Sequence, residues 1–135
     1  MKTIKRSSIL LILIFTTYIL SSCGSAEDKI PGSWITESVT ASVDSSQANL
    51  ASIDMAIAST KTTKFTLNED HTMTLSIDGY QSEAFWAYHS EDGDISFRMD
   101  AELGDPIELG KLEGNKIIYT SSVKHGSITA VYVKE

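Results

Sequence analysis

Short segments in which apolar and polar residues alternate limit the folds open to this chain more than any other feature. Alternation with a period of two is typical of β-strands that bury one face, because successive side chains point to opposite sides of a strand. The pattern predicts about eight strands, at Trp34–Val39 with an extension to Val43, Thr63–Leu67, Thr72–Ile77, Glu83–His89, Asp94–Met99, Ile107–Leu112, Lys116–Val123 and Ser127–Val133. Tight polar turns join most of these segments, and strands joined in this way are antiparallel neighbours. We therefore expect a mainly β domain whose chain meanders up and down.

A meander of this size has enough strands to close on itself. A closed sheet of about eight strands is either filled by its own side chains or holds one small ligand, and closure removes the exposed edges that invite aggregation. The side chains expected to point inward are mostly bulky: Trp34, Phe65, Leu67, Met73, Leu75, Ile77, Trp86, Phe97, Met99, Ile117, Tyr119 and Val123. Ligand pockets need about 300–1,000 Å³, so this set favours a filled or narrow barrel.

One stretch departs from the alternation. Residues 44–59 contain several alanines and neither glycine nor proline, and apolar residues recur there at helical spacing, at Leu50, Ile53 and Ile57. Asp44 followed by Gln47 has the pattern of a capping box, which satisfies free backbone N–H groups in the first turn of a helix. The sequence therefore predicts one helix of about three to four turns after the first strand, packed on the sheet or across one end of a barrel.

The first 22 residues have the pattern of a secretory signal. A positively charged start is followed by 12 mostly apolar residues from Ile9 to Leu20. As a helix this run would rise about 18 Å, against roughly 30 Å for the hydrocarbon core of a bilayer. It is too short to span a membrane comfortably and fits the apolar part of a cleavable signal.

The end of this run, Leu20-Ser21-Ser22-Cys23, resembles the lipobox of bacterial lipoproteins. The resemblance implies cleavage before Cys23, a thioether from its sulfur to diacylglycerol, and an acyl group such as palmitate on its new amino group. Two or more acyl chains anchor a protein stably to a membrane. The expected divisions are a signal peptide at 1–22, a lipidated cysteine with a polar tether at 23–30, and one domain at 31–135. Gly24, where aspartate would signal inner-membrane retention, implies the outer membrane and leaves its leaflet open.

The charge of the remaining chain excludes some partners. Residues 1–22 contain three of the 11 basic residues and none of the 18 acidic ones, so eight basic and 18 acidic residues follow, a formal charge of −10. This balance argues against nucleic acid and against electrostatic docking on anionic lipid. The acidic residues are scattered along the chain, which indicates a solvated surface more than a site for a cationic partner.

Four short motifs resemble those of the small lipocalin-like lipoproteins of Gram-negative bacteria. Gly32-Ser33-Trp34 matches the G-x-W of their opening strand, and the segment from Phe65 to Thr72 resembles their F-x-F-x-x-D-G-T hairpin, with His71 in place of the turn glycine. The following strands run from Phe85-Trp86 through Phe97, and Tyr132-Val133-Lys134 resembles the closing strand. The resemblance covers nearly all of residues 31–135 and implies a lipocalin-like barrel. It implies no chemistry, because the family has no agreed activity.

Motifs that carry catalysis are missing from the sequence. It has no G-x-S-x-G elbow, no H-E-x-x-H zinc motif and no glycine loop that cradles phosphate. His71, His89 and His125 fall at expected turns or strand ends, where histidine is usually a solvated polar residue. The segment 91–94 is typical of a hairpin turn, whereas a calcium site needs about six to eight oxygen ligands. We therefore expect no enzyme, no metal site and no cofactor.

Two functions follow from these expectations. The first is a lipid-anchored envelope domain that binds a small apolar or amphipathic ligand, with candidate contacts at Trp34, Phe65, Trp86, Phe97 and Tyr119. The second is an envelope interaction or accessory protein with a filled barrel, which docks a protein partner through its outer surface. The two tryptophans have a structural alternative as core residues at the seam that closes the barrel.

Overall fold

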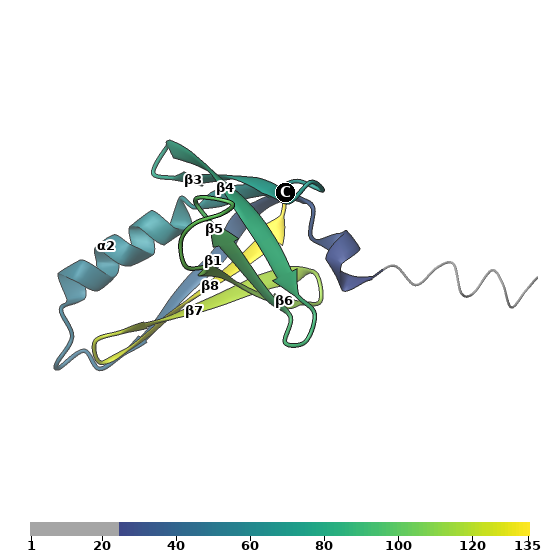
Figure 1. Cartoon of the computed structure of the whole chain (residues 1–135). Coiled ribbons are helices and arrows are strands. Elements are labelled where there is room, and N and C mark those ends of the chain that lie inside the picture. The colour runs from purple at the N-terminus through teal and green to yellow at the C-terminus, as the bar shows by residue number, and fades with distance from the viewer. Residues whose placement is uncertain (1–24) are drawn as a thin grey trace, which may run out of the picture.

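A computed structural model describes residues 25–135, which form a closed barrel of eight antiparallel strands with one α-helix after the first strand (Figure 1). The strands are β1 (Gly32–Val43), β2 (Lys64–Leu67), β3 (Thr72–Ile77), β4 (Tyr80–His89), β5 (Asp94–Arg98), β6 (Ile107–Glu113), β7 (Lys116–Val123) and β8 (Gly126–Lys134). Consecutive strands are neighbours all the way round, and β1 closes the barrel against β8. This confirms the predicted mainly β meander. The expected signal peptide and the expected lipobox with Cys23 lie outside the described residues.

The meander divides the connections between the two ends of the barrel, because neighbouring strands run in opposite directions. One end carries helix α2 (Leu50–Lys61), which connects β1 to β2, and the β3–β4, β5–β6 and β7–β8 connections; we call it the helix end. The other end carries the remaining three turns, the start of β1 and the end of β8; we call it the terminal end. A short 3-10 helix, η1 (Ala26–Lys29), precedes β1 there, and Figure 1 shows it on the side of the barrel away from α2.

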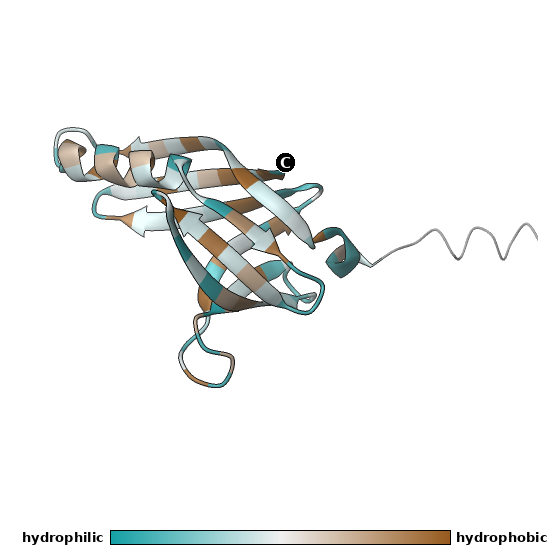
Figure 2. Cartoon of the chain, turned by 90° about the horizontal axis from the view of Figure 1, so that it is seen from above, coloured by the Kyte–Doolittle hydropathy of each residue, from teal (hydrophilic) through white to brown (hydrophobic). Residues whose placement is uncertain are grey.

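Side chains fill the interior of the barrel. The buried cluster consists of Ile30, Trp34, Phe65, Leu67, Met73, Ala84, Trp86, Ile95, Leu109, Ile117, Ala130 and Tyr132. In Figure 2 hydrophobic and hydrophilic residues alternate along the strands, as expected of a wall with one buried face. Ile30 is fully buried, so this residue of the expected tether is packed into the domain.

Two residues of the expected inward set are exposed. Ile77 is 37% exposed and Met99 is 51% exposed. Ile77 pairs with Tyr80 at the last position of the β3–β4 ladder, and Met99 follows the end of β5. Both therefore lie beyond the wall that neighbouring strands provide at the helix end. The prediction that they point into the core is wrong, because alternation implies burial only where a strand has a packed layer on one side.

Strand β6 approaches β7 very closely at Gly110. Its φ is 148°, and a Cβ atom there would lie 2.7 Å from Cγ2 of Ile117 and 2.9 Å from the carbonyl oxygen of Ile118. Glycine fits this position because it has no side chain to collide with the neighbouring strand and tolerates a positive φ.

Helix α2 begins later than the sequence predicts. Asn49 is the N-cap residue, and its side chain accepts a hydrogen bond from the first turn at 3.3 Å. Asp44 instead follows the end of the long β1–β8 ladder, where its N–H donates to the carbonyl oxygen of His125 at 3.0 Å. Its carboxylate accepts from the N–H and the hydroxyl of Ser46, which forms a turn. The predicted capping box of Asp44 and Gln47 is therefore wrong.

The C-terminal half of α2 is held to the barrel by hydrogen bonds. Asp78, in the β3–β4 turn, accepts from the hydroxyl groups of Ser59 and Thr62, both at 2.8 Å. On the other side, the hydroxyl of Thr36 in β1 lies 2.9 Å from the carbonyl oxygen of Thr60. The end of the helix is thus fixed between β1 and the β3–β4 hairpin. Within residues 25–135, no helix is long and apolar enough to cross a membrane.

Candidate functional site

Large apolar side chains are exposed mainly at the helix end. Of eight such residues in the described part of the chain, seven belong to α2, the β3–β4 hairpin or the β5–β6 connection and the start of β6. We call these seven the helix-end rim: Leu50, Met55, Ile77, Tyr80, Met99, Leu103 and Ile107. Their exposure ranges from 37% for Ile77 to 82% for Tyr80. Exposed apolar side chains that gather in one region mark an interaction site, whereas scattered ones need no explanation.

The turns of the terminal end, all within the described residues, are rich in acidic residues and carry no exposed large apolar side chain. These acidic residues include Asp70, which accepts a hydrogen bond from the Thr72 hydroxyl at 2.6 Å, and Asp92, which accepts from the backbone two residues later at 3.2 Å. The hydroxyl and N–H of Thr72 hold the pKa of Asp70 below its ordinary value, because they stabilise the carboxylate. Glu27 and Asp28 of η1 add further negative charge. Acidic side chains occur at both ends of the barrel, since the helix-end connections also carry exposed Asp78, Asp100 and Glu102, whereas exposed large apolar side chains concentrate at the helix end.

Three of the five expected ligand contacts are buried in the core. Trp34, Phe65 and Trp86 are only 1%, 2% and 3% exposed. The rings of Trp34 and Phe65 stack with 6.4 Å between centroids. The indole N–H of Trp34 donates to the carbonyl oxygen of Ile30 and that of Trp86 to Asn68, both at 2.9 Å. All three rings are packed on their neighbours, and both indole N–H groups already have acceptors. These residues therefore have a structural role in the wall of the barrel.

The other two expected contacts lie at the edge of the core. Phe97 and Tyr119 are half-buried and pack against the buried cluster. Phe97 is paired with Trp86 on one side and with Ile107 of the helix-end rim on the other. Next to Tyr119, burial raises the pKa of the Tyr132 phenol to about 12, with a smaller contribution from the Tyr119 side chain. Phe97 therefore adjoins the rim, while Trp34, Phe65 and Trp86 do not form part of it.

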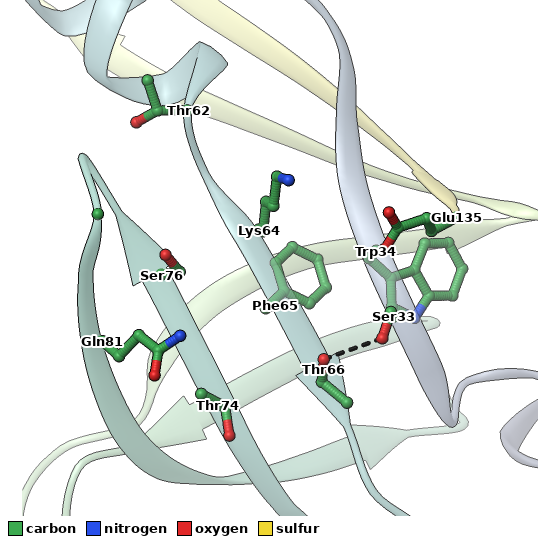
Figure 3. A pocket seen from close by; sticks show the side chains of 11 residues that line it. Ser33, Trp34, Thr62, Lys64, Phe65, Thr66, Thr74, Ser76, Gln81 and Glu135 are labelled. Carbon is green, nitrogen blue, oxygen red and sulfur yellow. Dashed lines mark hydrogen bonds between the residues drawn. The ribbon is translucent and has the colours of Figure 1, made fainter.

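A polar hollow of about 450 Å³ lies on the outer wall over β1 to β4 (Figure 3). Hydroxyl and amide side chains from these strands line it, and the Ser33 and Thr66 hydroxyls are hydrogen-bonded at 3.0 Å. Lys64 and Glu135 are its charged residues. The rings of Trp34 and Phe65 border it but are buried. This hollow offers hydrogen bonds without an exposed aromatic face.

A second hollow of about 450 Å³ opens at the terminal end, where His71 covers Trp86. The two rings stack with 4.4 Å between centroids and 21° between planes. His71 Nδ1 lies 3.1 Å from the Trp86 carbonyl oxygen, and its Nε2 lies 3.5 Å from Oε1 of Glu27. His71 has a φ of 68°, the left-handed conformation that glycine adopts readily. It therefore takes the backbone geometry expected of a turn glycine while its ring packs on the core.

A third hollow, of about 350 Å³, lies over β4 and β5 and contains a serine beside a histidine. Ser96 Oγ is 3.0 Å from His89 Nε2. Nucleophilic catalysis by such a pair depends on a carboxylate that orients the imidazole, and in residues 25–135 no carboxylate oxygen lies within 4.0 Å of a His89 nitrogen. His125 is exposed in the β7–β8 turn. The described residues also contain no group of three His, Cys, Asp or Glu side chains that could hold a metal ion.

No protein-family model matches the sequence, and it matches neither a curated protein nor a solved structure. The eight-strand barrel is compatible with a lipocalin-like fold. The candidate site therefore rests on the molecule's own geometry, in which the helix-end rim is the most distinctive surface. Sequence reasoning did not identify the rim, because it expected Ile77 and Met99 to be buried and Leu50 to pack on the sheet, and it gave Met55, Tyr80 and Leu103 no role. The signal was present as bulky apolar residues inside the connections between strands, such as Leu103 between Glu102 and Gly104.

Proposed function

We propose that this chain is a lipid-anchored domain of the bacterial envelope, of the lipocalin-like type, that binds a small apolar or amphipathic ligand at its helix-end rim. The observation that carries the proposal is that seven of the eight exposed large apolar side chains in residues 25–135 belong to elements at the helix end of the barrel. Covering each of them gains roughly 1 kcal/mol or more, since much of its surface contacts water in the free protein. A ligand that covers several of them gains several times this amount.

The filled interior supports binding on the rim over binding inside the barrel. The rings that would line a deep cavity contact one another, as where Phe65 meets Tyr132 edge to face with 5.0 Å between centroids. A ligand on the rim would reach inward as far as the half-buried Phe97. Trp34 and Trp86 would support the wall beneath it without touching the ligand.

The envelope part of the proposal rests on the sequence before residue 25. The lipobox supports lipidation of Cys23 and attachment to the outer membrane. The terminal end, from which the chain leads back to Cys23, would then lie near the membrane and the helix end would point away from it. The full chain should sediment with envelopes and carry covalent lipid, and Cys23→Ser should lose both. A Cys23→Ser protein that still sediments with envelopes contradicts the anchor.

Native mass spectrometry of the full chain recovered from its own envelope tests ligand binding. We expect a noncovalent adduct on the parent protein and its loss in a Met55→Ser, Leu103→Ser double variant. Phe85→Ser is the comparison variant, because Phe85 is 41% exposed on β4 and is not one of the seven rim residues, although the hollow that it lines extends to Ala101 and Pro106 of the β5–β6 connection. Recovery of the parent without an adduct, or equal adducts on all three proteins, contradicts the proposal.

The same filled interior favours a second function, the docking of an envelope protein on the outer wall. Phe85 is exposed there beside the hollow that Arg98 and Pro106 also line, and an aromatic next to an arginine is a frequent centre of protein interfaces. Cross-linking in intact cells should then return one reproducible partner that Phe85→Ser loses and the rim double variant keeps. A screen that returns no reproducible partner removes this alternative.

A further inference from the structure

We propose that the ligand is a single-chain amphipathic anion whose alkyl chain enters a slot between α2 and the β7–β8 hairpin and whose head group contacts Lys124. This inference rests on the proposed binding function and deepens it: it names the class of ligand and places the alkyl chain in a slot that adjoins the rim at Leu50 of α2.

The slot is narrow and largely apolar. It has a volume of about 140 Å³ and lies between the N-terminal half of α2 and the β7–β8 hairpin. Ile53, Val123 and Ile128 provide its apolar surface, and the small side chains of Ser52 and Ala56 leave the space open on the helix side. Ile53 and Ile128 are 8% and 6% exposed, so the floor of the slot is already part of the packed structure. An alkyl chain lying there would contact carbon on both sides.

The size of the slot limits the shape of its occupant. Drug-sized and cofactor-sized ligands occupy about 300–1,000 Å³, and the slot has less than half of the lower value. A fused-ring compound of drug or cofactor size therefore exceeds the volume of the slot, whereas part of one unbranched alkyl chain fits. Leu50 lies one helical turn before Ile53 and is 49% exposed, so a longer chain would continue from the slot onto the rim.

Lys124 is the charged residue that lines the slot, and its positive charge favours an anionic head group. Lys124 lines the slot from the β7–β8 turn and is exposed. In residues 25–135 no carboxylate oxygen lies within 4.0 Å of its ammonium group. The acidic group nearest this turn in the hydrogen-bond network is Asp44, whose carboxylate is already bonded to the N–H and hydroxyl of Ser46. Asn49, the N-cap residue of α2, also lines the slot, so the positive end of the helix dipole lies beside it.

The attachment of α2 allows the slot to widen. Its C-terminal half is fixed by Asp78 and Thr36, whereas Ile53 is the buried residue of the helix. Within residues 25–135, no side-chain hydrogen bond joins the N-terminal half to a strand, so only the packing of Ile53 holds it against the hairpin. An entering chain would replace the contacts of Ile53 with contacts of its own.

Photo-labelling of the full chain in nanodiscs tests this inference, with a photoactivatable dodecanoate as the probe. We expect saturable labelling within residues 49–56 and 123–128. Lys124→Gln should lower labelling about three- to fivefold, the effect of one exposed ionic contact. Ala56→Phe should lower it roughly tenfold or more, because the ring takes the volume that the chain needs. Lys61→Gln, at the other end of α2, and Ala58→Phe, on the opposite face of the helix, are the matched controls and should label like the parent.

Competition by unlabelled compounds tests the head group and the alkyl chain separately. Unlabelled dodecanoate should compete, and dodecanol and deoxycholate should each compete at least about fivefold more weakly, because one lacks the charge and the other is too wide. Equal competition by either compound overturns the assigned head group or chain. Saturable labelling confined to residues 77–80 or 99–107, indifferent to Lys124→Gln and Ala56→Phe, overturns the slot and leaves the proposed function standing. The absence of saturable labelling throughout residues 25–135 overturns both.

Discussion

His71 combines a left-handed backbone with a stacked ring, and a pair of substitutions separates the two. His71→Ala removes the ring and keeps a side chain that resists a φ of 68°. His71→Gly removes the ring and also relaxes the backbone, because glycine adopts positive φ at little cost. The difference between the two variants therefore reports the backbone, and their common loss reports the ring.

The magnitudes follow from the contacts. The stack on Trp86, with 4.4 Å between centroids, contributes about 0.5–1.5 kcal/mol, and the contact of Nδ1 with the Trp86 carbonyl oxygen contributes a similar amount. Both variants lose these terms. Alanine also keeps a left-handed cost of about 1–2 kcal/mol, whereas glycine avoids it but adds about 0.4–1 kcal/mol of entropy to the unfolded chain. His71→Gly should therefore be more stable than His71→Ala by about 0.5–1 kcal/mol, and both should be less stable than the parent.

Urea unfolding of the purified protein, followed by tryptophan fluorescence, measures these differences. With a denaturant slope of about 2 kcal/mol/M, the midpoints of the two variants should differ by about 0.3–0.5 M. His125, at a φ of 67° in the β7–β8 turn, is the control, because it has the same backbone geometry and no stacked ring. There the glycine–alanine difference should recur with little loss from the parent. A glycine variant at position 71 that is no more stable than the alanine variant would falsify the reasoning.

Three further predictions concern the barrel and its helix. Gly110→Ala should lower the free energy of unfolding by about 2–4 kcal/mol in urea denaturation, because its Cβ would lie 2.7 Å from Cγ2 of Ile117 at a positive φ; an unchanged midpoint would mean that β6 and β7 separate easily. Asp78→Ala should speed amide hydrogen exchange in the last turns of α2 while leaving β7 and β8 protected, and uniform acceleration would contradict a local role. Because the Tyr132 pKa is raised from 10.0 to about 12, its contribution to stability is complete below pH 10 and is lost as the pH rises toward 12. Tyr132→Phe should therefore flatten the alkaline fall of the urea midpoint, and an equally steep fall in the variant would contradict this assignment.

The strands could be predicted from the sequence because the two features that define them, alternating apolar residues and flanking turn residues, are both local. β3 and β7 begin and end at the predicted residues, Thr72–Ile77 and Lys116–Val123, since alternating apolar residues stand between turn residues on both sides. The antiparallel meander could then be predicted because the connections between most strands are short. The sequence also indicated the left-handed turn at His71, because His71 stands at the glycine position of the F-x-F-x-x-D-G-T hairpin motif.

The start of the helix and the candidate site depended on distant partners. Asp44 has the sequence of a helix cap, but its N–H bonds to His125, which lies far along the chain. Ile77 and Met99 continue the alternation of their strands, yet they are exposed because β2 pairs with β3 only as far as Ser76 and β5 ends at Arg98. The slot beside Lys124 arises only where α2 crosses the β7–β8 hairpin. None of these facts is encoded within a short window of residues.

The order of the strands also makes the two ends of the barrel independently variable. The 99–106 loop connects β5 to β6 and takes no part in the ladder between β1 and β8, and it lies at the end of the barrel opposite to the segment leading back toward residue 25. Lengthening this loop, or exchanging the tip of the β3–β4 hairpin, would alter what the molecule recognises without disturbing how the wall closes. The same scaffold is therefore suited to the selection of new specificities from libraries randomised in these two connections.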